Sequence, residues 1–517
     1  MNNNSSLSTL TENLVSFTAR RVTSSLIWCL PELCNSEEVL SSCSYLTEPD
    51  GTGEAKVFMA ERYGGSGIQR NGGGARCGYN GRYQVKGIGA NPLVGEGSDW
   101  HHSNGALSAS QAIYEALWGE VLSQVLPYGA VRTQAVLLTD NYIDIKFERS
   151  RGPAQRALLI REPVIRPAHF ERAPYFLPQS RYASQLIDDA KRVGSVIHQL
   201  PSCLPIPSQG FSKEAALEPE HHCLEGLCEL ARRQARQIAF CRSRFLLLTT
   251  SPSNIAMDGR LLDFNGLSCL FPGNTRSGFE YQLKMTQLMK EPSILLQGLT
   301  DLCLYLGKYL FNPAFASYAQ QQLESCFQFA FYETCSRSYL ELFGIPEEFL
   351  SVDKIPEVLK PLAECFSVLI NRHNSTQYSR NNNECNETSL GYIAAMLINY
   401  HQNKQLAGST YVKGDIHFVR TLQAFSDAAH WLLDAGRLRG LNAPYVLKIM
   451  EEQARQRLQP RNCLEKINML GKISDLIDAY RDDKPLLTEA FSTMKKELQV
   501  FTRMVFGNGQ RYTTGRG

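Results

Sequence analysis

The spacing of apolar residues changes along the chain and predicts two kinds of structure. After about Tyr182, apolar residues repeat at intervals of three and four, which places them on one face of a helix. One such series is Leu295, Leu299, Leu302, Leu306 and Leu310. Between Lys56 and about Arg166 the apolar runs are short, alternate with polar residues and are interrupted by glycines, which is typical of strands and tight turns. The pattern predicts an α+β protein, in which a small β-rich lobe precedes a large α-helical lobe.

These sequence patterns divide the chain into four parts. Residues 1–55 are polar and mixed, and no role is predicted for them. Residues 56–170 are predicted to form the β-rich lobe and residues 171–505 the helical lobe. Residues 506–517 are predicted to be a disordered tail, and the polar insert at 372–388 a mobile loop.

The overall composition suits a globular protein. The chain has 517 residues, of which 53 are Lys or Arg and 51 are Asp or Glu, so the formal net charge is +2. This near-balance argues against a protein that coats nucleic acid or an anionic membrane, and the sequence lacks a run of about 18 apolar residues that would predict a membrane span. The 15 cysteines are scattered without a Cys-x-x-Cys pair, and the first residues do not resemble a signal peptide. We therefore expect a cytoplasmic protein with reduced thiols.

A glycine-rich segment is the first candidate for a binding site. Ten of the 38 glycines lie between residues 63 and 89, and glycine lets backbone N–H groups approach a phosphate closely. Asn80-Gly81 predicts a two-residue hairpin turn, followed by a strand on which Gln84 and Lys86 share one face. Lys86 is therefore placed to reach bound phosphates. The simpler interpretation is a solvated lysine on an edge strand.

A lysine in this role needs a carboxylate partner, and the next predicted helix offers two. Residues 110–125 have helical spacing, and the neighbours of Glu115 on the helix are small, so another segment can approach it. Glu115 is one candidate partner of Lys86, and Glu120 is the alternative. A solvated glutamate on a helix surface is the simpler interpretation.

Two arginines follow an apolar, β-like run. The run 157–161 ends in Arg161, and Arg166 follows a few residues later. Planar guanidinium groups at a strand end bind phosphate through paired hydrogen bonds. Both arginines are therefore candidate phosphate ligands, with ordinary surface arginines as the alternative.

A second hairpin predicts a cation site. Asp258-Gly259 is a type I′ turn signal, and folding the chain there places Asn254 directly opposite Asp263, with Cβ atoms about 5 Å apart. An amide oxygen and a carboxylate at that separation suit Mg²⁺, because phosphate oxygens and water can complete its coordination. The alternative is an Asn–Asp pair that only closes a turn.

In this order the parts resemble those of a protein kinase: a glycine-rich loop, a strand lysine, a helix glutamate, and an asparagine paired with a downstream aspartate. In detail, residues 60–270 resemble the selenoprotein O family, pseudokinases that transfer AMP rather than phosphate. The resemblance rests on Gly72-Gly-Gly-Ala-Arg76, Val85-Lys86-Gly87-Ile-Gly89-Ala-Asn-Pro92, Asn104-Gly105-Ala106, Arg166-Pro-Ala-His-Phe-Glu171 and the step from Ser253-Asn254 to Asp263. It implies a protein-kinase-like two-lobed fold.

The resemblance also implies roles for individual residues. Lys86 and Glu115 would be the catalytic ion pair, and Asn254 and Asp263 would hold Mg²⁺. The residues in contact with ATP would be Gly72, Gly74, Lys86, Asn104, Gly105, Arg161, Arg166 and Asp263. The chain departs from the family pattern at Ser253 and Asn104, which both replace acids, and residues 507–517 lack the family's redox cysteine motif.

The whole chain also resembles, in length and sequence, maturation proteins of siderophore-conjugated microcins. That resemblance implies a precursor peptide as substrate, a glucosylated catecholate siderophore as the group joined to its carboxyl end, and an acyltransferase-like partner protein. We therefore expect an ATP-dependent AMP transferase that activates a peptide carboxylate. The alternative is a non-catalytic pseudokinase that binds the precursor peptide and scaffolds the partner.

Overall fold

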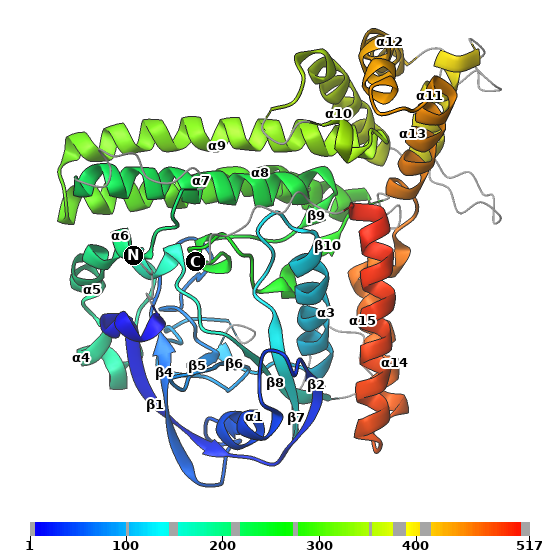
Figure 1. Ribbon diagram of the computed structural model, residues 1–517. Coiled ribbons are helices and arrows are strands. Elements are labelled where there is room, and N and C mark those ends of the chain that lie inside the picture. The colour runs from blue at the N-terminus through cyan, green and yellow to red at the C-terminus, as the bar shows by residue number, and fades with distance from the viewer. Residues whose placement is uncertain are drawn as a thin grey trace.

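An eight-stranded antiparallel sheet and a larger set of helices make up the α+β structure in Figure 1. The structure is a computed structural model that describes residues 6–99, 103–143, 153–207, 218–271, 278–350, 354–375, 389–403 and 415–507. The predicted loop at 372–388 and the predicted tail at 506–517 lie largely outside the described residues.

The sheet has the strand order β2-β7-β8-β6-β5-β4-β1-β3, and neighbouring strands are antiparallel. The strands are Leu14–Arg21 (β1), Ser24–Cys29 (β2), Tyr45–Leu46 (β3), Ala55–Glu61 (β4), Cys77–Tyr79 (β5), Gln84–Lys86 (β6), Thr133–Ile143 (β7) and Ala154–Arg161 (β8). Three of them come from residues 1–55. Strand β6, which carries Lys86, lies between β5 and β8 and is not an edge strand.

The hairpin before Lys86 is present, but its turn lies one residue later than predicted. Tyr79 pairs with Gln84, and Asn80 N donates to Tyr83 O at 3.1 Å, so the loop residues are Gly81 and Arg82. Gly81 has a φ of +97°, and glycine at the first loop position suits a type II′ turn. The Asn80 side chain accepts from the Tyr83 backbone N–H at 2.8 Å and so supports the turn from outside.

The two faces of the sheet bury different helices. Because strand side chains alternate, Leu158 of β8 packs in a small core with Val39 of α1 (Ser36–Cys43), whereas Leu159 joins the main core with Leu117 of α3. Helix α3 spans Ala109–Val125, so the predicted helix is confirmed, and Ser108 caps it by accepting from Gln111 N at 3.3 Å.

Helices form most of the remaining chain. They are α4 (Ala183–Leu186), α5 (Asp189–Val196), α6 (Leu200–Cys203), α7 (Pro219–Ser243), α8 (Gly278–Tyr309), α9 (Pro313–Leu342), α10 (Lys360–Ser375), α11 (Ser389–Asn403), α12 (Ile416–Arg437), α13 (Ala443–Arg457), α14 (Lys466–Ala479) and α15 (Lys484–Phe506). The long helices α7, α8 and α9 lie side by side. The predicted leucine series lies in α8 and just beyond it, and its first four members are buried. Strands β9 (Leu246–Leu247) and β10 (Ser268–Cys269) form a separate pair.

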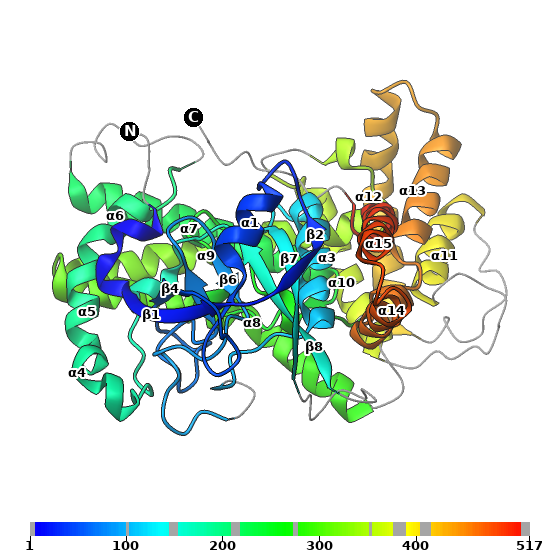
Figure 2. The same ribbon diagram turned by 90° about the horizontal axis from the view of Figure 1, so that it is seen from below.

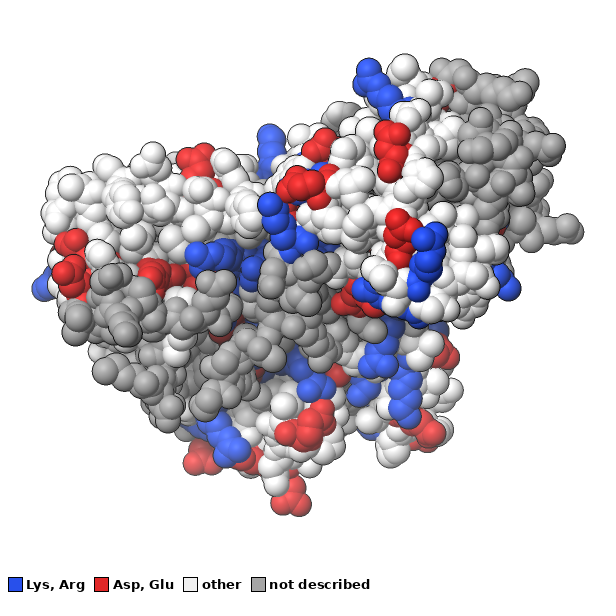
Figure 3. All heavy atoms as spheres, turned by 45° about the horizontal axis from the view of Figure 1, so that its top comes forward, with Lys and Arg blue, Asp and Glu red and all other residues white. Residues whose placement is uncertain are grey.

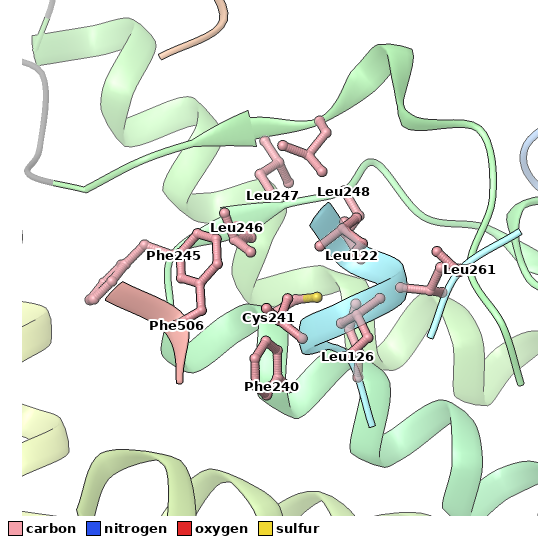
Figure 4. Packing of buried hydrophobic residues seen from close by; sticks show 14 of the residues in the cluster. Leu122, Leu126, Phe240, Cys241, Phe245, Leu246, Leu247, Leu248, Leu261 and Phe506 are labelled. Carbon is pink, nitrogen blue, oxygen red and sulfur yellow. The ribbon is translucent and has the colours of Figure 1, made fainter. Parts of the chain in front are cut away.

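The last two helices return to the sheet end of the molecule and pack against α3, as Figures 1 and 2 show. Lys495 of α15 lies over the ring of Trp28 in β2, and Arg503 Nε donates to Gln124 Oε1 at 3.0 Å. Figure 4 shows Phe506, at the end of α15, beside Phe245 in the main core. Helix α3 is therefore packed between the sheet and the C-terminal helices.

The surface carries both signs of charge. On the face in Figure 3, Lys and Arg side chains are interspersed with Asp and Glu side chains, as the formal net charge of +2 leads one to expect. Within the described residues, no helix combines the length and the apolar character that crossing a bilayer requires.

Candidate functional site

A cavity of about 580 Å³, here called the central cavity, lies where the glycine-rich segment meets the segment between α7 and α8. Its volume falls in the range typical of small-molecule sites, roughly 300–1,000 Å³. The lining residues are Tyr63, Gly67, Ile68, Gln69, Asn71, Gly73, Gly74, Ala75, Arg76, Cys77, Asn104, Ala106, Gln111, Ile143, Arg161, Thr249, Ser253, Asn254, Asp263, Asn265 and Gly266.

Lys86 is fully buried and joins two carboxylates behind the cavity wall. Its Nζ lies 2.5 Å from Glu115 Oε2 and 2.6 Å from Asp263 Oδ1. The predicted contact between Lys86 and Glu115 is therefore confirmed, and the alternative partner, Glu120, pairs with Arg132 instead. A buried charge is tolerated when it is paired and hydrogen-bonded, and here both conditions are met. Because Asp263 lines the cavity, Lys86 contacts the cavity lining through this residue.

Glu115 connects three separate segments. Besides Lys86, its Oε2 accepts from Asn265 Nδ2 at 2.6 Å, and its Oε1 accepts from Arg161 Nη1 at 3.2 Å. Its helical neighbours Ala112 and Ala116 are buried and small, which leaves room for β6 and β8 to approach. Glu115 therefore fixes a lysine, an arginine and an asparagine relative to one another.

Asp263 is the acid of the central cavity. Its φ of +65° lies in the left-handed region, which is uncommon for residues other than glycine and occurs often at functional sites. Burial would raise the pKa of Asp263, but the positive charges of Lys86, Arg76 and Arg161 outweigh that effect and lower the pKa well below its ordinary value. Asp263 is therefore ionised at neutral pH and carries the charge that a cation ligand needs.

The hairpin that carries Asn254 differs from the predicted register by one residue. Ile255 pairs with Leu261, and Leu262 N donates to Asn254 O at 3.0 Å, so Asn254 lies opposite Leu262 and not opposite Asp263.

The loop of this hairpin explains the shift. Ala256 N donates to Arg260 O at 2.8 Å and Gly259 N donates to Ala256 O at 2.9 Å, which leaves three residues in the loop. Gly259 has a φ of +93°, whereas Asp258 does not have the positive φ that a type I′ turn requires. A turn followed by a left-handed glycine is the usual three-residue loop. Despite the shift, Asn254 and Asp263 both line the central cavity.

The oxygen atoms at the cavity fit a cation that is shared with a ligand. They comprise the Asp263 carboxylate, the Asn254 amide oxygen, which accepts from Ser253 Oγ at 3.3 Å, and Asn265 Oδ1, a buried atom without a hydrogen-bond donor in the described part of the chain. No group of three or more His, Cys, Asp or Glu side chains suited to a metal occurs among the described residues. Mg²⁺ accepts such a sparse protein shell when phosphate oxygens and water supply the remaining ligands.

The structure brings some of the predicted nucleotide ligands to the cavity and places others behind its wall. Those that line it are Gly74, Asn104, Arg161 and Asp263. Gly72 does not line it, because its N–H donates to Leu93 O at 2.9 Å and its Cα faces the ring of Phe176. Gly105 packs against the backbone of Gly89, where a Cβ would lie 2.1 Å from the carbonyl carbon.

Arg166 also lies behind the wall, and protein groups engage its guanidinium. Nη1 donates to Ser253 O at 2.9 Å and to Tyr63 Oη at 3.4 Å, and Nη2 donates to Gln84 Oε1 at 3.3 Å. The guanidinium also stacks 5.0 Å from the centre of the Tyr63 ring. In this structure Arg166 joins the glycine-rich segment, strand β6 and the residue before Asn254.

Two polar residues of the site, Arg76 and Gln84, were not among the predicted site residues. Arg76 lines the cavity, and no described residue forms a hydrogen bond or ion pair with its guanidinium. Gln84 lies on the same strand face as Lys86, and its Oε1 accepts from both Arg161 and Arg166. The signals for both were present, because Arg76 ends the Gly72–Arg76 segment and Gln84 precedes Lys86 by two residues on a strand.

Comparisons with known proteins do not assign the chain to a family. No protein-family model matches the chain, and a search of curated proteins gave no match. The resemblances described above therefore rest on the residues of this chain, and the family remains a prediction.

Proposed function

We propose that the protein is an ATP-dependent AMP transferase of the selenoprotein O type, with ATP bound in the central cavity between two kinase-like lobes. The observation that carries this proposal is the position of Lys86, which bridges Glu115 and Asp263 at a cavity that also presents Arg161 and Asn254. Kinases hold ATP and its Mg²⁺ with the same parts: a strand lysine paired with a helix glutamate, an aspartate and an asparagine.

The residues that line the cavity and Lys86 behind its wall have separate roles in holding ATP. Lys86, Arg76 and Arg161 supply positive charge for the phosphate oxygens, and Asn254 and Asp263 would hold the cation. When bound, Mg²⁺ would neutralise charge on the phosphates and on the departing pyrophosphate. In this proposal Glu115 acts by holding Lys86 and Arg161 in place.

We propose that the acceptor is a carboxylate. Among the lining residues that the structure describes, Asp263 is the only acid, and it is paired with Lys86. The residue before Asn254 is Ser253, so the position expected for a general base holds no acid. A carboxylate is already ionised at pH 7 and needs no base, whereas a hydroxyl acceptor does.

The proposed step balances without a further reactant. A carboxylate oxygen attacks the α-phosphorus of ATP, the bond from that phosphorus to the oxygen bridging to the β-phosphate breaks, and pyrophosphate leaves. The product is an acyl-adenylate. Resemblance of the whole chain to microcin maturation proteins suggests that the carboxylate is the C-terminus of a precursor peptide. A hydroxyl of a glucosylated siderophore would then displace AMP and form an ester, together with the acyltransferase-like partner, in the cytoplasm.

A second candidate function is a non-catalytic scaffold that holds the precursor peptide and the partner protein. Two observations favour it: Ser253 and Asn104 stand where the family has acids, and the Arg166 guanidinium is engaged by protein groups.

One assay separates these functions. The protein, the precursor peptide, the partner and the glucosylated siderophore are incubated with ATP labelled on the α- or the γ-phosphate, and the products are separated. An AMP transferase releases labelled AMP and pyrophosphate in amounts that depend on the peptide. Release of ADP and phosphate would instead indicate phosphate transfer, and ATP binding without turnover would support the scaffold.

A further inference from the structure

Asn265 follows Asp263 by two residues and is held firmly at the central cavity. It lies in the short 3₁₀ turn Phe264–Gly266. Its carbonyl oxygen accepts from Lys466 Nζ of α14 at 2.6 Å. The next residue, Gly266, touches Thr249 so closely that a Cβ would lie 1.9 Å from Thr249 Oγ1. The backbone of Asn265 therefore has little room to shift.

The contact with Glu115 fixes which way the Asn265 amide points. Asn265 Nδ2 donates to Glu115 Oε2 at 2.6 Å, and the same oxygen accepts from Lys86. A carboxylate can only accept, so the amide nitrogen must face it, because the flipped amide would set two oxygens against each other. Asn265 Oδ1 is thereby directed away from Glu115. It is buried and has no donor among the described residues.

We infer that Asn265 Oδ1 is a third oxygen ligand of the cation that Asn254 and Asp263 hold; this inference rests on the proposed function. Amide oxygens are suitable ligands for hard cations, and Asp-x-Asn is a spacing at which calcium loops supply two successive ligands. Lys86 occupies Oδ1 of Asp263, so the other carboxylate oxygen can face the same cation.

The competing role for Asn265 Oδ1 is a hydrogen bond from the nucleotide, such as from a ribose hydroxyl. The anchoring of Asn265 favours the cation. Glu115 holds Asn265 directly and holds Asp263 through Lys86, so contacts within the protein, without a nucleotide, position the two side chains relative to each other. A fixed relation is what a cation with strict ligand geometry requires.

The first test measures Mn²⁺ binding to the full chain in the presence of ATP by electron paramagnetic resonance. Asn265→Ala is expected to weaken Mn²⁺ binding about tenfold or more, in line with losses that follow removal of groups around a metal. ATP binding in EDTA is expected to stay within about twofold of the unchanged protein, since a metal ligand acts only when the metal is present.

A second variant adds a gain of binding as the readout, which a disturbed Glu115 would not produce. Asn265→Cys places a thiolate close to the former amide oxygen, one bond nearer the backbone, and thiolates favour soft cations. We expect tighter Cd²⁺ binding and a new Cd²⁺–thiolate absorption in the ultraviolet, measured as the difference from the unchanged protein. Gln111→Cys, which also adds a thiol to the cavity lining, is the control and is expected to give neither change.

Four results would overturn the inference. Equal loss of ATP affinity in Asn265→Ala with and without Mn²⁺ would assign the amide to the nucleotide. Unchanged Mn²⁺ binding together with no Cd²⁺ signal in Asn265→Cys would exclude it as a ligand. If the unchanged protein binds ATP but no Mn²⁺, the cation site itself is wrong, whereas failure to bind ATP at all would overturn the proposed function as well.

Discussion

Lys86 Nζ lies 2.6 Å from Asp263 Oδ1, although 177 residues separate the two in sequence. This contact ties the middle of the sheet to the segment between α7 and α8, and the Lys86–Glu115 pair extends it to α3. The ion pairs of Lys86 with Asp263 and Glu115 therefore connect the sheet, the segment between α7 and α8, and helix α3 beside the central cavity.

Replacing Lys86 with methionine tests how much the buried ion pairs of Lys86 contribute to the stability of the protein. Lys86→Met leaves two carboxylates without their shared ammonium, and breaking a buried ion pair costs about 3–5 kcal/mol. Arg161 and Asn265 still contact Glu115, so we expect a loss of about 3 kcal/mol in the free energy of unfolding by urea. Arg82→Met is the matched control. Arg82 lies in the turn of the same hairpin and forms a surface ion pair with Glu38 of α1, and its loss should cost less than about 1 kcal/mol. Equal unfolding midpoints for the two variants would contradict the description of Lys86.

The pair Asp263→Ala and Asp258→Ala tests the cation site. Mg²⁺ should increase the thermal stabilisation by ATP in the unchanged protein, and Asp263→Ala should remove that increase, because Asp263 supplies the only formal negative charge of the proposed protein ligands. Asp258 lies in the hairpin loop and accepts from Arg260 N at 3.0 Å. Its loss should cost about 1 kcal/mol of stability and leave the Mg²⁺ effect intact. The opposite pattern in thermal unfolding would show that the cation lies elsewhere.

The raised pKa of Glu171 leads us to expect that the stability of the folded protein depends on pH. Burial, together with the nearby Asp301 carboxylate, raises the pKa of Glu171 from 4.5 to about 8, although Arg192 opposes this. The folded protein keeps the proton while the unfolded chain releases it above its lower pKa. Stability should therefore fall as pH rises from about 5 to about 8, and Glu171→Gln should flatten this fall. Thermal unfolding at pH 5, 6.5 and 8 measures the effect, and parallel curves for the two proteins would refute it.

The contact of Gly67 with the segment before Asn254 predicts a steric effect. A Cβ at Gly67 would lie 2.2 Å from Ser251 Oγ and 2.8 Å from Ser253 Oγ. Gly67→Ala must therefore displace the glycine-rich segment, and we expect roughly tenfold weaker ATP binding, which corresponds to about 1.4 kcal/mol. Gly471 of α14 has open space around its Cα, so Gly471→Ala should leave ATP binding unchanged and stabilise the helix by up to about 1 kcal/mol. Titration with ATP compares the two variants.

Local patterns in the sequence predicted the parts of the site that depend on one element. Helical spacing predicted α3, and the small neighbours of Glu115 favoured it over Glu120 as the partner of Lys86. Strand alternation also placed Gln84 and Lys86 on one face of their strand. The same alternation is present in β1, where Val15, Phe17 and Ala19 alternate with polar residues, and it would have predicted a strand in residues 1–55.

Features that depend on contacts between distant segments could not be predicted. Arg166 faces Gln84, Tyr63 and Ser253, which come from three segments, and no local pattern indicates that they meet. The Asp258-Gly259 pair is compatible with a two-residue and a three-residue loop, and the choice between them shifts the register by one residue. Asn265 can be recognised as a site residue only when its contact with Glu115 is known.

A calorimetric titration of the full chain with ATP in the presence of Mg²⁺ tests the nucleotide site most directly. We expect one ATP bound per chain, with binding weakened by removal of Mg²⁺ and by Lys86→Met but not by Arg82→Met. Absence of binding at millimolar ATP and Mg²⁺, or binding that Lys86→Met leaves unchanged, would contradict a nucleotide site in the central cavity.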